Sequence, residues 1–274
     1  MMYGRIILAF AALFAAWNAS GKEPELSDAE RAAFVAYSQQ NFHKAARLAR
    51  EFRHTPRGRL LSGLCDVFDK EENTLNRGLH TLEELFNDPL IPLKIRLEAG
   101  LSLARTLRLE QLQHAPGAGR HSKADRIFLA IIKLAPDTEY ARDAMFYHSL
   151  NHFSSCDAKV CSDGFNGLEN FINNFRGPKK LLAPLHLLAE HEYIRLRKNY
   201  HAAVAHLESG IKIGFTSPNE QRSAMFRLGF FYYKYLKDRP RAEKALTDFL
   251  RRYPNSPDTP SAERFLKELR EVKP

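Results

Sequence analysis

Residues 238–257 read DRPRAEKALTDFLRRYPNSP, and the spacing of their side chains predicts one helix of a closely packed pair. Ala242 is followed by Leu246 four residues later, by Phe249 seven later and by Pro254 twelve later. Residues four and seven apart lie on one face of an α-helix. The small alanine lets a second helix approach closely, the two larger side chains fill the contact, and the proline ends the helix.

The same offsets recur along the chain, which indicates a repeated structural unit. Residues 122–138 match at all four positions, and three further segments match in part. The matching residues are Ala124, Phe128, Ile131 and Pro136; Ala45, Ala49 and Phe52; Ala203, Leu207 and Gly210; and Gly164, Leu168 and Phe171. In two copies an asparagine and an aromatic residue, Asn41-Phe42 and Asn199-Tyr200, stand just before the alanine. Five matches at fixed offsets are more than generic amphipathicity explains.

An all-α fold is expected after residue 25, because apolar residues recur there at intervals of three and four. We find no alternating apolar and polar run, so no strand is predicted. The chain has 274 residues, enough for one elongated domain or two small ones, and no break demands a second one within 22–274. Helical hairpins are predicted at about 27–53, 57–87, 92–135, 138–176, 181–213 and 219–253. A final helix at 259–271, polar on its outer face, is predicted to cap the stack.

A first helix with matching spacing precedes the C-terminal copy. In MFRLGFFYYKY, residues 225–235, Leu228-Gly229 is followed by Tyr232. With Ala242, Leu246, Phe249 and Pro254, these residues resemble the tetratricopeptide repeat (TPR) family, over roughly residues 27–271. The ending RRYPNSPDTPSAERFL resembles divergent repeats of bacterial cell-envelope proteins, such as outer-membrane assembly lipoproteins and cell-division coordinators. The resemblance implies a right-handed superhelical stack of helical hairpins, a TPR-like α-solenoid, but repeat signatures say little about function.

Residues 1–21 have the layout of a secretory signal peptide. Arg5 precedes an apolar run, Ile6–Trp17, and small polar residues follow, with cleavage expected after Gly21 or, less favourably, after Ala19. The alternative is an uncleaved anchor, but twelve residues span about 18 Å, short of the ~30 Å hydrocarbon core of a membrane. No later stretch is long and apolar enough to be a transmembrane span. We therefore expect export to the periplasm.

The three cysteines are too few for a disulfide scaffold. Cys156 and Cys161 lie in a polar segment and can close a local disulfide in an oxidising compartment, the alternative being two free thiols. Cys65, in LLSGLCDVF, is expected to be a small buried hydrophobic residue on a helix.

The sequence offers no catalytic motif. Of eleven histidines, His148 and His152 share one helical face, but HExxH is absent and no carboxylate stands between them. Motifs such as GxSxG are absent too. We therefore expect no metal, no cofactor and no enzymatic activity, and interpret the histidines as scattered surface or groove residues.

An aromatic helix supplies the candidate partner-binding groove. If Leu228, Gly229 and Tyr232 pack as in the resembled family, other side chains face the concave surface. These are Phe226, Phe230, Tyr233 and Lys234, with Met145 and His148 at the corresponding place in another repeat. A peptide or helix of a partner would cover the exposed aromatic rings. The alternative is that the C-terminal helix folds back and covers them.

The charge balance is basic, with a net charge of +9. Nucleic acid is the usual partner of such a chain, but export argues against it. Acidic protein, acidic glycan or anionic lipid head groups would serve, and most basic residues are expected on solvated faces. We therefore expect a non-enzymatic scaffold or adaptor that binds a protein or peptide partner in the bacterial cell envelope. The alternative is a cell-wall glycan-associated protein, or an enzyme with an unrecognised active site on the repeats.

Overall fold

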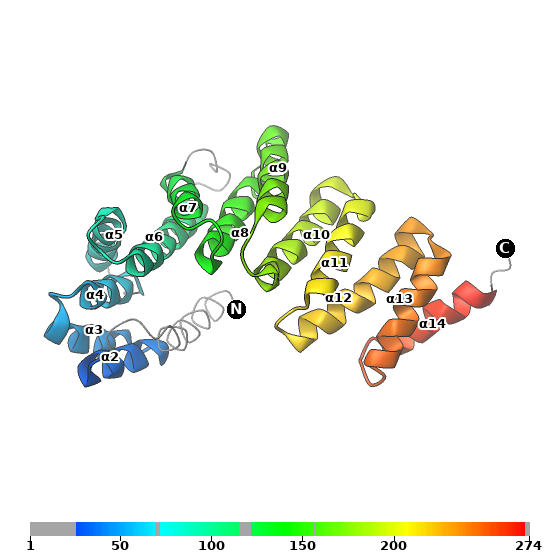
Figure 1. The fold of residues 1–274 in the computed structure, drawn as a ribbon, viewed down its shortest axis with the longest axis horizontal. Helices are drawn as coiled ribbons and strands as arrows, with labels where there is room; N and C mark the ends of the chain where they lie inside the picture. Colours follow the sequence, from blue (N-terminus) through cyan, green and yellow to red (C-terminus); the bar gives the residue numbers. More distant parts are fainter. Residues whose placement is uncertain (1–25, 69–71, 115–121, 156, 272–274) are drawn as a thin grey trace. The chain divides into compact units, whose positions relative to one another are not determined.

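The computed structural model describes residues 26–68, 72–114, 122–155 and 157–271. They form helices joined by short turns, with no strand among them, which confirms the predicted all-α helical-repeat fold (Figure 1). The α-helices are α2 (Asp28–Ser38), α3 (Phe42–Ala49), α4 (Pro56–Phe68), α5 (Glu72–Asn87), α6 (Leu93–His114), α7 (Lys123–Leu134), α8 (Glu139–Phe153), α9 (Ala158–Asn174), α10 (Ala183–Arg197), α11 (Tyr200–Ile213), α12 (Pro218–Phe231), α13 (Arg239–Arg252) and α14 (Thr259–Glu271). Two 3-10 turns, η1 (Arg50–Phe52) and η2 (Lys179–Leu182), and a π-helical turn, η3 (Tyr232–Leu236), complete the set.

Each predicted hairpin corresponds to two consecutive helices, from α2 and α3 to α12 and α13. The final helix predicted at 259–271 is α14, Thr259–Glu271. Within the described ranges, no helix combines the length and apolar character needed to cross a membrane. The predicted signal peptide, residues 1–21, lies outside the described residues and stays a prediction.

The chain divides into two compact units, the first ending and the second beginning within α7, at residues 131 and 132. The sequence indicated no boundary at this place. In the first unit each helix from α2 to α5 packs against the helix that follows it, so that the last of these contacts is α5 with α6. In the second unit the pairs α8 with α9, α10 with α11 and α12 with α13 form hairpins, and α14 packs on α13.

The repeated small and apolar residues lie in the core. All of them have at most 9% of their surface exposed or are buried glycines, as the five copies predicted. They are Ala45, Ala49, Phe52, Ala124, Phe128, Ile131, Gly164, Leu168, Phe171, Ala203, Leu207, Gly210, Ala242, Leu246 and Phe249. The residues at fixed offsets in the sequence are therefore the ones that hold each helix in its contact.

The turns of three hairpins share one backbone conformation. Each has a non-glycine residue with positive φ directly before a capping side chain. The positive-φ residues are Gln40, Lys198 and Lys237, and the caps are Asn41, Asn199 and Asp238. Each cap oxygen accepts a hydrogen bond from a backbone N–H three residues on, which would otherwise have no partner in the helix. The recurring asparagines of the sequence are thus helix N-caps.

Gly229 marks the closest approach of α12 to α13. A Cβ atom there would lie 2.7 Å from Leu246 Cδ2 and 3.3 Å from the Leu246 backbone nitrogen. Gly167, in α9, has nothing within 4 Å of the corresponding position. Substitution by alanine is therefore expected to have opposite effects on stability at the two glycines.

We expect Gly229→Ala to lower the free energy of unfolding by about 1–3 kcal/mol, because the added methyl group overpacks the contact with Leu246. Gly167→Ala should raise it by about 0.5–1 kcal/mol, because alanine restricts the unfolded chain and fits an open helix position. Urea unfolding followed by circular dichroism measures both. Equal stability of the Gly229→Ala variant and the original chain would contradict the close-approach argument.

Candidate functional site

The predicted aromatic groove is covered by the C-terminal helix. Phe265 of α14 has its ring centroid 6.4 Å from that of Phe226, 5.6 Å from Phe230 and 4.8 Å from Tyr233. Phe265 itself is only 9% exposed. The structure therefore has the packing of the second of the two alternatives, in which the final helix packs on these rings. Phe226, Phe230 and Tyr233 are half-buried, and their role in a partner-binding groove stays a prediction.

Polar contacts extend this cover. The Tyr233 hydroxyl donates a hydrogen bond to Glu268 of α14, and this bond raises the pKa of the tyrosine. Lys234 stays exposed, with its Nζ 5.4 Å from the centroid of the Phe230 ring. The physical reason for this packing is that an aromatic cluster and an amphipathic helix of the same chain bury each other's apolar faces.

The other two predicted groove residues do not join this surface. Met145 is 6% exposed and belongs to the core formed with Phe153 and Phe165. The Ser149 hydroxyl lies 3.4 Å from its sulfur. Met145 therefore packs in the core, and its predicted part in partner binding stays a prediction. His148 is half-buried and packs edge-on against His152, with ring centroids 4.4 Å apart.

The structure describes two of the three cysteines, Cys65 and Cys161. Cys65 is 3% exposed, as predicted, and burial raises the pKa of its thiol to about 12, so the thiol stays protonated at neutral pH. Cys161 Sγ lies 3.4 Å from the carbonyl oxygen of His152 and 3.3 Å from that of Ser155. Cys156 lies outside the described residues, so the Cys156–Cys161 disulfide stays a prediction.

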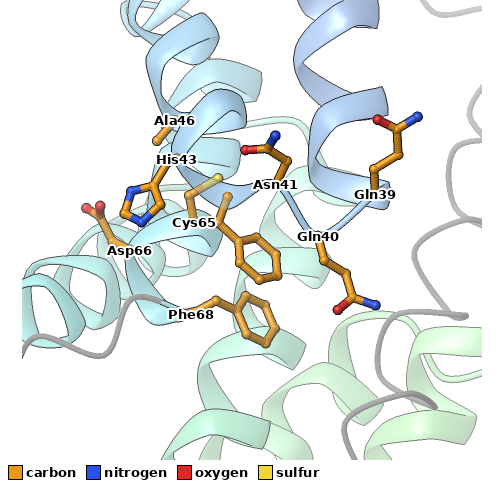
Figure 2. Close-up of a pocket in the computed structure, with 9 residues that line it drawn as sticks. Gln39, Gln40, Asn41, His43, Ala46, Cys65, Asp66 and Phe68 are labelled. Carbon is orange, nitrogen blue, oxygen red and sulfur yellow. The ribbon is translucent and has the colours of Figure 1, made fainter.

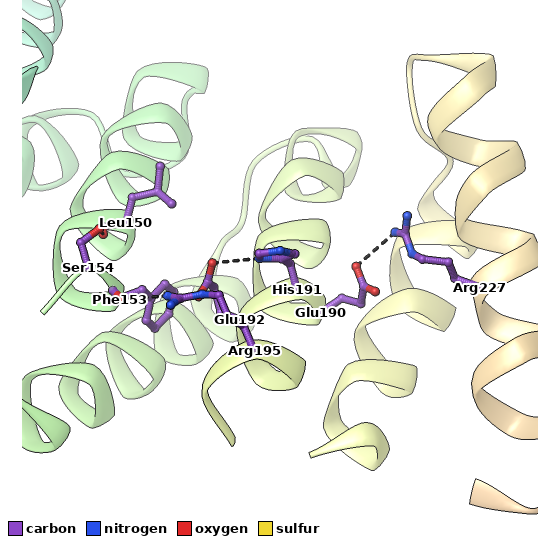
Figure 3. A network of polar contacts seen from close by, with 8 residues as sticks. All are labelled: Leu150, Phe153, Ser154, Glu190, His191, Glu192, Arg195 and Arg227. Atoms are coloured by element: carbon purple, nitrogen blue, oxygen red, sulfur yellow. Dashed lines mark hydrogen bonds and ion pairs between the residues drawn. The ribbon is translucent and has the colours of Figure 1, made fainter. Parts of the chain in front are cut away.

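A polar network on α10 reaches its neighbouring helices on both sides (Figure 3). Arg227 of α12 lies 3.1 Å from Glu190 of α10. On α10 itself, Glu192 accepts hydrogen bonds from the Arg195 Nε, at 2.7 Å, and contacts His191 at 3.0 Å. Arg195 also donates to the backbone carbonyl of Phe153, at the end of α8, at 2.8 Å. We name Glu190, His191, Glu192, Arg195 and Arg227 the polar face.

Buried acids hold exposed cations in the polar face. Glu190 and Glu192 are only 5% and 4% exposed, whereas the side chains of His191 and Arg195 are 67% and 46% exposed. Burial raises the pKa of Glu190, and the Arg227 guanidinium opposes that rise. Guanidinium and imidazole N–H groups held in this way can donate to a carboxylate from another chain. Sequence reasoning missed this set, although the Glu192–Arg195 spacing of three was a usable signal.

A second network runs through α9, α10 and α11. His186 Nδ1 lies 3.0 Å from His206 Nδ1, and His206 Nε2 lies 2.8 Å from a Glu169 oxygen, which also accepts the Tyr193 hydroxyl. The two Nδ1 atoms share one hydrogen bond, so one of them carries the proton and the other accepts it. Burial, and then the proximity of His206, lowers the pKa of His186 to about 4. The hydrogen bond from His206 lowers the pKa of Glu169.

The first unit has a pocket of about 530 Å³ at the turn between α2 and α3 (Figure 2). Its lining combines amide groups with stacked aromatic rings. The lining residues are Gln39, Gln40, Asn41, Phe42, His43, Ala46, Cys65, Asp66 and Phe68. Phe42 and Phe68 stack at 4.8 Å, and the Asp66 carboxylate is paired with Arg77 at 2.7 Å. With its thiol protonated and its acid paired, this pocket has the chemistry of a small binding cavity.

Comparison with known proteins yields one family match. A model of the tetratricopeptide repeat matches residues 223–256, from within α12 to the turn after α13. The match supports the predicted repeat at this hairpin, and such repeats commonly form protein-interaction scaffolds. No curated protein matches the chain significantly.

The lowered pKa of His186 predicts a pH-dependent stability. An unfolded histidine titrates near 6.5, so between about pH 6.5 and 4 the unfolded chain binds more protons than the folded one. The stabilisation is complete above pH 6.5 and is lost as the pH falls towards 4, by about 1–3 kcal/mol. Urea unfolding at pH 7.0 and 4.5 measures the loss.

His186→Gln should remove most of this pH dependence, because glutamine can still donate to His206 but does not titrate. Its matched control is His201→Gln, an exposed histidine on α11, which should keep the full dependence. Glu169 contributes a further loss below its unfolded pKa in both variants. The same pH dependence in both variants would contradict the assignment to His186.

Proposed function

We propose that this chain is an exported, non-enzymatic scaffold of the bacterial cell envelope that binds an acidic segment of a partner protein. The observation that carries the proposal is the helical-repeat fold with a tetratricopeptide repeat at residues 223–256, since such repeats commonly bind other proteins. Export rests on the signal-peptide pattern of residues 1–21, and the cell-envelope setting rests on the resemblance of the C-terminal repeat.

The polar face is the surface we propose for the partner. The aromatic rings of α12 are already packed on α14, so they are not a free apolar groove. The polar face, by contrast, spans contacts among α8, α10 and α12 in the second unit and exposes its cations. His191 and Arg195 stand one turn apart on α10, so a segment that runs along this helix would meet both.

Two physical features favour an acidic segment. The cationic groups are held by buried carboxylates, so a partner has less side-chain entropy to offset when it binds. The chain also carries a net charge of +9, which accelerates encounters with acidic partners. Glu192 and Glu190 each pair with one arginine, Arg195 and Arg227. A carboxylate on the partner would accept hydrogen bonds from guanidinium N–H groups that these acids do not use.

Peptides selected for binding from a random library should be enriched in Asp and Glu. Binding of a selected labelled peptide, measured by fluorescence anisotropy, should weaken about tenfold in Glu192→Gln/Arg195→Gln, because a charge-assisted hydrogen bond is lost. This double change keeps the net charge and avoids leaving a buried carboxylate unpaired. The protein is purified from its source cells, so its mass also reports whether it begins at Lys22.

The matched control is Asp248→Asn/Arg251→Gln, which neutralises an exposed pair with the same spacing on α13. This control should bind the peptide as the original chain does. No acidic preference, or equal binding by both double variants, would contradict the polar-face proposal. A native chain that begins at Met1 would contradict cleavage of the predicted signal peptide.

A further inference from the structure

Two histidines of α8, His148 and His152, stand one helical turn apart at the surface of the second unit. The spacing of four places both imidazoles on the same face of the helix. Their ring centroids are 4.4 Å apart, with the ring planes inclined at 64°, and both residues are half-buried. One ring nitrogen of His148 lies within 4.8 Å of one ring nitrogen of His152.

A contact with α9 fixes the protonation of His152. Its Nδ1 lies 3.1 Å from the backbone carbonyl oxygen of Val160, a residue only 4% exposed. A carbonyl oxygen can only accept a hydrogen bond, so Nδ1 carries the proton and Nε2 carries the lone pair. A backbone carbonyl on the far nitrogen is the arrangement that orients histidine ligands in metal sites and raises their basicity.

We propose that His148 and His152 together chelate one divalent d-block cation, with Zn²⁺ as the reference ion and water molecules completing its coordination. Neutral imidazole suits Zn²⁺, Ni²⁺ and Cu²⁺, whereas Mg²⁺ and Ca²⁺ take oxygen ligands. Zinc–nitrogen bonds of about 2.0–2.1 Å place two tetrahedral ligands roughly 3.3 Å apart. Zinc binding would therefore require the two nitrogens, which lie within 4.8 Å of each other, to adopt that separation.

From the sequence this pair is not interpreted as a metal site, because the HExxH pattern of a catalytic zinc site is missing. That pattern reports a metalloprotease helix and says nothing about a site without a catalytic base. The orientation of His152 by Val160 depends on how α8 and α9 pack, which the i, i+4 spacing alone does not reveal. A bound ion would brace one turn of α8 and, through the Val160 contact, the α8–α9 hairpin.

Isothermal titration of the full chain with ZnCl₂ at pH 7.5 tests the site. We expect one equivalent whose affinity falls on the order of tenfold or more in His148→Ala/His152→Ala, because a second tethered ligand acts at high effective concentration. The matched control, His54→Ala/His201→Ala, removes two exposed histidines that are not neighbours in the sequence. It should retain the affinity of the original chain.

Three readouts separate ligation from an effect on folding. Circular dichroism without metal should show the same helicity in all three proteins. Zinc should also shift the imidazole proton resonances of His148 and His152 in nuclear magnetic resonance spectra, and lowering the pH to 5.5 should weaken binding because protons compete for the nitrogens. Absence of zinc binding, or equal affinity in the two double variants, would overturn the proposal and leave the histidines as packing partners.

Discussion

The structure depends on how closely helices pack at small residues, which the repeat places in the second helix of five of the six hairpins. Ala45, Ala203 and Ala242 have no exposed surface, and at Gly229 even a methyl group would meet Leu246. Protein interiors are packed densely enough that such contacts tolerate little added volume. The larger residues at offsets of four and seven then fill the space that the small residue leaves. The repeat is therefore a packing requirement, and its residues recur in five of the six hairpins.

That requirement also determines which surfaces remain for binding. Gly229 takes the closest contact of α12 with α13, and the rings of Phe230 and Tyr233 pack against Phe265 of α14. The polar face then becomes the better candidate for a partner. Its buried carboxylates contribute little to stability, since burial of charge offsets much of the attraction between ions. Their effect is to hold Arg195 and Arg227 in place, which is what a binding surface requires.

The sequence predicted the helical hairpins and α14 well, because small-residue offsets and proline positions are local signals. The asparagine pairs were noticed, and the structure explains them as N-caps that follow positive-φ residues such as Gln40. The candidate site was harder to predict from the sequence. Whether Phe226, Phe230 and Tyr233 face solvent or α14 depends on a contact more than thirty residues away, which no local pattern encodes. Glu190 and Arg227 are 37 residues apart, and each taken singly has the sequence signature of a solvated helix face.

The central claim is that α14 is an integral layer that covers the aromatic rings of α12. Hydrogen exchange of the purified chain, followed by mass spectrometry without any partner, tests it most directly. The account predicts that the backbone amides of Phe265–Leu269 exchange as slowly as those of α12 and α13, because all three helices open together. Exchange of α14 at the rate of an unstructured peptide, while α12 stays protected, would contradict the claim and return the aromatic rings to the list of open binding surfaces.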